Sequence, residues 1–213
     1  MVEQGIRIVQ TAVRFRLGPP KYMKTLLIDA DGLVITRPKY FSEMYSEKYG
    51  VPLKIITEFF INDFKICQTG KADLKEQLKP YLPKWKWEGT TDDFLNLWFT
   101  LDVTPNQKVL DIIDHLRKKG YKCFLASDQE KYRAEYIKNV LKGHFDEMFF
   151  SCNLGYTKAE QEFFEEITKK INVEPENIEF WDDEIENTQV AVNLGIKTKL
   201  YIDPETFEKS FND

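Results

Sequence analysis

The second half of the chain alternates between two hydrophobic spacings, one typical of helices and one typical of buried strands. Short apolar runs predict strands over residues 123–126, 148–150, 178–181 and 198–202, and the stretches between them predict helices over 129–141, 159–171 and 185–194. An earlier apolar run at residues 25–28 supplies a fifth strand. Strands and helices that alternate through short connections indicate the α/β class, with a Rossmann-like parallel sheet of about five strands flanked by helices.

The most clearly marked helix is expected to begin at Thr104-Pro105-Asn106-Gln107, which resembles a capping box with proline at the first helical position. Its apolar face would carry Val109, Ile112, Ile113 and Leu116, and Lys118-Lys119-Gly120 would end it. The residues after the last strand are expected to form a polar tail.

Between residues 37 and 101 the spacing is helical and no strand is convincing. Four helices are predicted there, around residues 41–49, 56–64, 74–82 and 94–98. They interrupt the alternation between its first and second strands, so we expect an inserted helical cap, residues 38–101, on an α/β core made of residues 23–37 and 102–213. A cap in that place would cover the edge where parallel sheets bind ligands.

The first 22 residues form an extension of uncertain status. They carry Arg7, Arg14 and Arg16 with one acid, Glu3, and Met23 stands directly before the first strand. A native surface element, a targeting segment and a misassigned start all fit this pattern.

Composition narrows the classes of partner. The net charge is −5, with 30 basic residues scattered among 35 acidic ones, which disfavours a nucleic-acid partner. The three cysteines show no Cys-x-x-Cys spacing, and no apolar run approaches the ~20 residues that span a bilayer. We therefore expect a cytoplasmic protein without membrane contact that binds a small anionic molecule. We also expect a monomer or weak homodimer.

The first candidate site lies at the end of the first predicted strand, where Asp29 and Asp31 flank one residue and Gly32 follows. One carboxylate there could attack phosphorus while the second protonates the leaving oxygen. Acids followed by glycine are also common turn formers, so this motif alone supports either interpretation.

Polar residues follow other predicted strands. Ser127 ends the second strand, Lys158 lies in a loop before a helix, and Asp182-Asp183 directly follows the fourth strand. A hydroxyl and an ammonium can hold a phosphoryl group, and two crowded carboxylates repel each other unless a cation such as Mg²⁺ sits between them. Capping of the next helix is the other interpretation of the acid pair.

In this order, Asp29-x-Asp31, Ser127, Lys158 and Asp182-Asp183 resemble the four motifs of the haloacid dehalogenase (HAD) superfamily of phosphohydrolases. The resemblance extends over residues 24–202, and the insertion after the first motif is similar to the helical cap of that family. Features that look like the branch of sugar-phosphate phosphatases and the soluble epoxide hydrolase phosphatase domain are Trp98, Thr104-Pro105, Asn187 and Gly195.

The resemblance implies a role for each motif residue. Asp29 would be the nucleophile that becomes an aspartyl-phosphate, and Asp31 the acid that later activates water. Ser127 and Lys158 would bind the phosphoryl group, with Asp128 beside them in the phosphate-binding set. Magnesium would be held by Asp29, the backbone carbonyl of Asp31, and one or both of Asp182 and Asp183.

Three residues depart from the family pattern: Leu33 after the glycine, Ala159 where proline is usual after the lysine, and Asp128 where asparagine is common. Asp128 matters most, because an added carboxylate weakens anion binding unless it points away. The aromatic side chains of the insertion are expected to pack inside the cap rather than to enclose a substrate.

The expected function is magnesium-dependent hydrolysis of a small phosphate monoester, with sugar phosphates favoured by the family branch. A phosphomutase on the same fold is the nearest alternative. A degenerate member that binds a phosphorylated ligand without turnover is a second, motivated by Asp128 and Ala159. Dehalogenation is disfavoured, because neither a second acid at Asp31 nor a metal-binding acid pair is needed for it.

Overall fold

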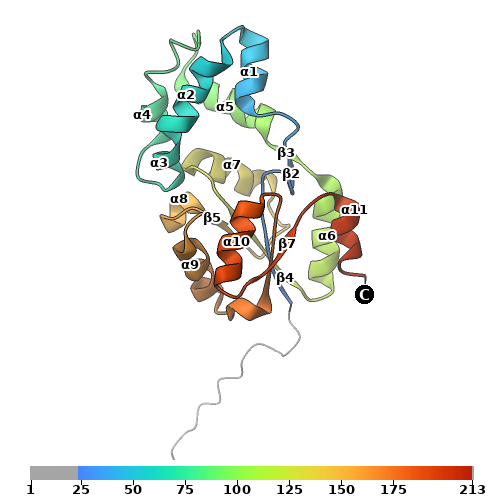
Figure 1. Cartoon of the computed structure of the whole chain (residues 1–213). Coiled ribbons are helices and arrows are strands. Elements are labelled where there is room, and N and C mark those ends of the chain that lie inside the picture. The colour runs from blue at the N-terminus through green and yellow to red at the C-terminus, as the bar shows by residue number, and fades with distance from the viewer. Residues whose placement is uncertain (1–23, 213) are drawn as a thin grey trace, which may run out of the picture.

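The computed structural model describes residues 24–212, so the expectation for residues 1–22 lies outside the described part. One parallel sheet has the strand order β5-β4-β1-β6-β7 (Figure 1). Its strands are β1 (Thr25–Ile28), β4 (Lys122–Ser127), β5 (Glu147–Phe150), β6 (Ile178–Asp182) and β7 (Lys197–Leu200). The predicted five-stranded α/β fold is confirmed.

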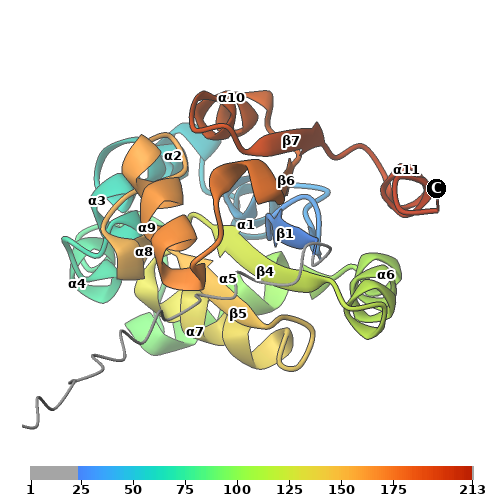
Figure 2. The same ribbon diagram turned by 90° about the horizontal axis from the view of Figure 1, so that it is seen from below.

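Helices cover both faces of the sheet (Figure 2). Successive side chains of a strand point to opposite faces, so Leu26 and Ile28 of β1 lie in one apolar core and Leu27 in the other. Helices α6 (Gln107–Lys118), α7 (Lys131–Val140) and α11 (Pro204–Lys209) contribute buried side chains to the first core. The second core is covered by α9 (Gln161–Ile171) and α10 (Ile185–Asn193).

The insertion forms a group of helices beyond one edge of the sheet (Figure 1). Its helices are α1 (Phe41–Tyr49), α2 (Leu53–Asn62), α3 (Phe64–Gln68), α4 (Leu74–Leu78) and α5 (Thr91–Asp102). The second predicted helix is therefore two helices, because the chain turns at Asp63, whose carboxylate accepts the hydroxyl of Tyr81. We call residues 38–101 the cap.

A short antiparallel ribbon joins the two connections between cap and core. Ile35–Thr36 (β2) pairs with Thr104–Pro105 (β3). The prediction that a helix begins at Thr104-Pro105 is therefore wrong: these residues pair with a distant segment, and α6 begins at Gln107. The backbone N–H of Asn106 donates to the carbonyl of Val34 at 2.8 Å, which continues the link.

The chain after β7 is helical rather than a polar tail. Helix α11 has proline in its first turn, and Asp203 caps it by accepting the backbone N–H of Thr206 at 2.7 Å. Phe207 is fully buried against Trp181, with ring centroids 4.8 Å apart. Two further short elements are α8 (Ser151–Leu154) and the 3-10 helix η1 (Pro175–Asn177). Within residues 24–212, no helix has the length and apolar character needed to cross a membrane.

Candidate active site

The parallel register brings three predicted site residues to one edge of the sheet. β1 lies between β4 and β6, so the carboxyl ends of all three strands are adjacent. Asp29 directly follows β1 and donates its backbone N–H to the carbonyl of Trp181 at 2.9 Å. Ser127 ends β4 and Asp182 ends β6, and all three polar side chains are buried.

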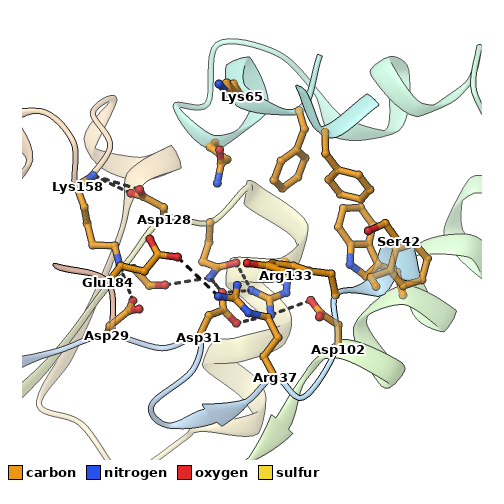
Figure 3. Close-up of a pocket in the computed structure, with 18 of the residues that line it drawn as sticks. Asp29, Asp31, Arg37, Ser42, Lys65, Asp102, Asp128, Arg133, Lys158 and Glu184 are labelled. Carbon is orange, nitrogen blue, oxygen red and sulfur yellow. Dashed lines mark hydrogen bonds and ion pairs between the residues drawn. The ribbon is translucent and has the colours of Figure 1, made fainter. Parts of the chain in front are cut away.

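Lys158 reaches the same edge from the loop before α9 (Figure 3). Its Nζ lies 2.8 Å from Oδ1 of Asp29 and 2.7 Å from Oδ2 of Asp182, and its side chain is only 6% exposed. Burial alone would lower the pKa of this ammonium, but the two carboxylates outweigh burial and raise it. Lys158 is therefore a fixed cation beside the candidate nucleophile.

Three carboxylates crowd around this position. One oxygen from each of Asp29, Asp182 and Asp183 lies within 4.8 Å of the others. Burial raises the pKa of Asp29 well above its usual value, Lys158 opposes that shift, and the charge of Asp182 adds to it. One lysine is too little positive charge for three crowded acids, of which Asp29 and Asp182 are buried, so the cluster calls for a further cation.

Two details of the backbone and side chains fit a divalent metal there. Oδ1 of Asp183 is buried and has no hydrogen-bond partner among the described residues. Gly32 has φ +79°, and a Cβ at this position would come within 1.9 Å of Oδ2 of Asp183. The glycine thus lets a carboxylate approach the turn after β1, and hard oxygen donors of this kind suit Mg²⁺.

The interpretation of Asp182-Asp183 as a helix cap is wrong. The N-cap residue of α10 is Glu184. Asp182 instead accepts the backbone N–H of Glu184 at 2.8 Å and the side-chain amide of Asn187 at 3.1 Å. These contacts orient Asp182 toward Lys158 and give the side chain of Asn187 a structural role.

Asp31 lies beside the cluster in a separate ion pair. Arg133 of α7 holds both its oxygens, at 2.7 and 2.8 Å, and Nε2 of Gln129 donates to it at 2.7 Å. Burial raises the pKa of Asp31, but the guanidinium of Arg133 outweighs burial and brings it to about 2. Held in this way, Asp31 is an ionised carboxylate, and it must exchange these contacts before it can donate a proton.

Two further residues complete this network. Nη2 of Arg133 also lies 3.0 Å from Oδ2 of Asp102, the last residue of α5, so one buried guanidinium joins the core to the cap connection. Gln129 donates to Oγ of Ser127 at 2.9 Å. Sequence reasoning missed Gln129, Arg133 and Asp102; the available signal was the four-residue spacing of Gln129 and Arg133 directly after Ser127.

Asp128, which stands where asparagine is common in the family, forms hydrogen bonds with the backbone of Lys158. Its carboxylate oxygens accept the backbone N–H of Lys158 at 3.0 and 3.2 Å. Burial raises the pKa of Asp128 to about 6, against the opposing charge of Lys158. Asp128 therefore fixes the loop that carries Lys158, at the point where Ala159 replaces the usual proline.

We predict that Asp128→Asn keeps the phosphate-ester hydrolysis expected from the sequence within about threefold of the wild type, because the amide oxygen still accepts the N–H of Lys158. Asp128→Ala removes the acceptor and is expected to lower kcat/KM about tenfold, the cost of one hydrogen bond of about 1.4 kcal/mol. Steady-state kinetics on one phosphate ester would measure both. Equal losses in the two variants would show that charge, not hydrogen bonding, is what Asp128 contributes.

A cavity of about 540 Å³ opens between this edge of the sheet and the cap. Asp29, Asp31, Ser127, Asp128 and Lys158 line it from the core. The prediction that aromatic side chains pack inside the cap holds for Trp85, which is fully buried. The cap residues that line the cavity include four aromatic side chains for which the sequence analysis expected packing alone: Tyr40, Phe60, Phe64 and Trp98.

Known structures share this fold. A HAD family enzyme from Bacteroides thetaiotaomicron superposes with a TM-score of 0.77 at 21% identity, over 90% of this chain and 99% of that one. The wild-type form of the same enzyme, solved in complex with magnesium and inorganic phosphate, gives 0.76 at 23% identity over 89% and 100%. A protein from Porphyromonas gingivalis that is described as a predicted HAD-like family hydrolase gives a TM-score of 0.69 at 21% identity, over 90% of this chain and 99% of that one.

The family model of haloacid dehalogenase-like hydrolases matches residues 23–195. That range contains every residue of the candidate site, from Asp29 to Asp183, together with the whole cap. The chain belongs to the haloacid dehalogenase-like hydrolase family.

Proposed function

We propose that this protein is a magnesium-dependent phosphatase that hydrolyses a small phosphate monoester through an aspartyl-phosphate on Asp29. The observation that carries the proposal is the environment of Asp29: a buried carboxylate, paired with the ammonium of Lys158, at the floor of a cavity large enough for a small ester. A neutralised carboxylate in that place can approach an anionic phosphoryl group, whereas an isolated one would repel it.

In the first step, a carboxylate oxygen of Asp29 forms a bond to phosphorus and the bond from phosphorus to the ester oxygen breaks. The alcohol leaves with a proton from Asp31. In the second step a water molecule gives a proton back to Asp31 and attacks the aspartyl-phosphate, which releases inorganic phosphate and regenerates Asp29. Lys158 and the hydroxyl of Ser127 hold the phosphoryl oxygens throughout both steps.

The residues that would hold magnesium are Asp29, Asp182 and Asp183 with the backbone carbonyl of Asp31. A bound Mg²⁺ would neutralise the acid cluster and withdraw charge from the phosphoryl oxygens. The crowding of the three carboxylates supports this assignment, and the related Bacteroides enzyme was solved with magnesium and phosphate.

Asp31 must leave Arg133 and Gln129 and take up a proton before it can act as the acid, because it is ionised in this pair. Its carboxylate is fully engaged by these two residues, and a proton donor needs at least one oxygen facing the substrate. Entry of the phosphate ester provides a competitor for Asp31, because the anionic oxygens of the phosphate can accept from the guanidinium of Arg133. The freed carboxylate can then take up a proton and donate it to the ester oxygen.

The purified protein is expected to hydrolyse p-nitrophenyl phosphate only when millimolar Mg²⁺ is present, with loss of activity on chelation and recovery on re-addition. A panel of sugar, nucleotide and simple alkyl phosphates would then rank the esters, and it would test the preference for sugar phosphates that the family branch suggests. If no ester were hydrolysed in the presence of Mg²⁺, the phosphatase proposal would be refuted, and the protein would be better explained as one that binds a phosphorylated ligand. Conversion of glucose 1-phosphate to glucose 6-phosphate without phosphate release would establish the mutase alternative.

A further inference from the structure

The cavity has two chemically different sides. The core side carries the charged and polar groups described above, while six side chains of the cap side are apolar or aromatic: Tyr40, Phe41, Phe60, Ile61, Phe64 and Trp98. Figure 3 shows rings from the cap helices facing the charged residues at the edge of the sheet. Whatever is attached to the phosphoryl group must occupy the space between these two sides.

The aromatic part of this wall is held in place by its own packing. The ring of Trp98 stacks on Phe41 at a centroid distance of 5.0 Å and meets Phe60 edge-on at 5.3 Å. Phe64 lies 5.7 Å from Trp98 and 5.4 Å from Phe60. A wall built from such contacts is formed before a ligand arrives, so a ligand does not have to order it.

The rim of the wall is apolar and exposed. Ile61 of α2 is 65% exposed, and Tyr40, before α1, is 57% exposed. Scattered exposed apolar side chains need no explanation, but these two are continuous with the lining of the candidate catalytic cavity. A ligand that covers them removes apolar surface from water, which favours binding.

Polar side chains are the minority among the cap residues that line the cavity. Ser42, Thr57, Lys65 and Gln68 line the cap side as well, but the hydroxyl of Thr57 already donates to the carbonyl of Lys54 at 3.2 Å. On the core side, Arg133 is paired with Asp31 and Asp102. Arg37 lies 3.9 Å from Glu184, and the amide of Asn187 donates to Asp182. A leaving group with many hydroxyl groups would place several of them against the aromatic rings of the cap. Each such hydroxyl would lose its hydrogen bonds to water.

We propose that the natural substrate is a phosphate monoester whose leaving group is poor in hydroxyls and has an apolar or aromatic body that packs on Phe60, Ile61 and Phe64. This inference rests on the proposed phosphatase function and specifies its substrate class. It departs from the preference for sugar phosphates, which came from the resemblance to one family branch.

Primary alkyl phosphates test the class without a change in reaction chemistry. Benzyl phosphate, hexyl phosphate, glucose 6-phosphate and glycerol 3-phosphate all release a primary alcohol, so differences in kcat/KM report how the leaving group is recognised. Benzyl or hexyl phosphate is expected to exceed glucose 6-phosphate at least tenfold, which corresponds to about 1.4 kcal/mol. A ranking led by glucose 6-phosphate or glycerol 3-phosphate would overturn the inference.

A matched pair of variants locates the contact. Ile61→Ser changes an exposed residue that lines the cavity, whereas Ile66→Ser changes an isoleucine of α3 that is 43% exposed and does not line it. Both substitutions are at exposed positions, so neither is expected to disturb the fold. Ile61→Ser should lower kcat/KM for benzyl phosphate severalfold and leave glucose 6-phosphate unchanged, and Ile66→Ser should change neither. An equal loss on both esters in Ile61→Ser would contradict the proposed contact.

A binding measurement separates failure of this inference from failure of the proposed function. With Mg²⁺ present, calorimetric titration should show benzylphosphonate binding at least tenfold more tightly than methylphosphonate to the wild type, with the difference reduced in Ile61→Ser. If benzylphosphonate binds more tightly in this way but no ester is hydrolysed, the phosphatase proposal is refuted and the proposed apolar binding site is retained. Turnover with equal affinity for the two phosphonates would refute the apolar site alone.

Discussion

Asp29→Asn is expected to lower the proposed phosphatase activity by at least about a thousandfold, because the proposed mechanism needs the carboxylate of Asp29 to form the bond to phosphorus. The fold should persist, since Lys158 keeps its ion pair with Asp182 and the substitution changes one oxygen to an amide. Steady-state kinetics on p-nitrophenyl phosphate with saturating Mg²⁺ measures the loss, and thermal unfolding checks the fold.

A covalent intermediate gives this prediction a second readout. Acid quench during turnover should leave phosphate bound to the wild-type protein and none on Asp29→Asn. Asp111→Asn is a suitable control, because Asp111 is an exposed acid on α6 whose side chain accepts only from Gln107 among the described residues. If Asp29→Asn kept a tenth of the wild-type rate, or if phosphate were trapped on another residue, Asp29 would not be the nucleophile.

The regular part of the core could be predicted because its signals are local. The run at residues 123–126 is apolar throughout, since β4 lies between β1 and β5 in the sheet, and similar short runs mark the other strands. The strand ends then follow from parallel pairing, which brings Asp29, Ser127 and Asp182 together without any knowledge of their contacts.

Other features depend on residues far apart in the chain. Thr104-Pro105 has the composition of a helix start, but its pairing with Ile35–Thr36 overrides that local preference. Helix α11 has one buried side chain, Phe207. A single apolar residue shows no periodicity from which a helix could be predicted. The cavity wall was missed for a related reason: Phe60, Phe64 and Trp98 both pack on one another and face the ligand space, and spacing does not separate these roles.

The ion pair of Asp31 with Arg133 spans 102 positions, and the spacing of Gln129 and Arg133 does not identify Asp31 as the partner. Its contacts also include Asp102, so the guanidinium neutralises two carboxylates whose side chains are 15% and 11% exposed. Arg133→Met is expected to destabilise the protein by about 3–5 kcal/mol, because removing one partner of a buried pair leaves charge without compensation. The free energy of unfolding from urea titrations measures the loss.

Matched variants separate charge from packing in that loss. Arg117→Met removes an arginine whose side chain is 29% exposed in its pair with Asp146, and we expect a loss of about 1 kcal/mol or less. Adding Asp31→Asn and Asp102→Asn to Arg133→Met should recover part of the lost stability, because no ionised acid then lacks a partner. Arg133→Lys keeps the charge but cannot hold both oxygens of Asp31, so it should fall between the wild type and Arg133→Met. A loss in Arg133→Met no larger than in Arg117→Met, or one that the two asparagines leave unchanged, would mean that this network contributes packing rather than charge neutralisation.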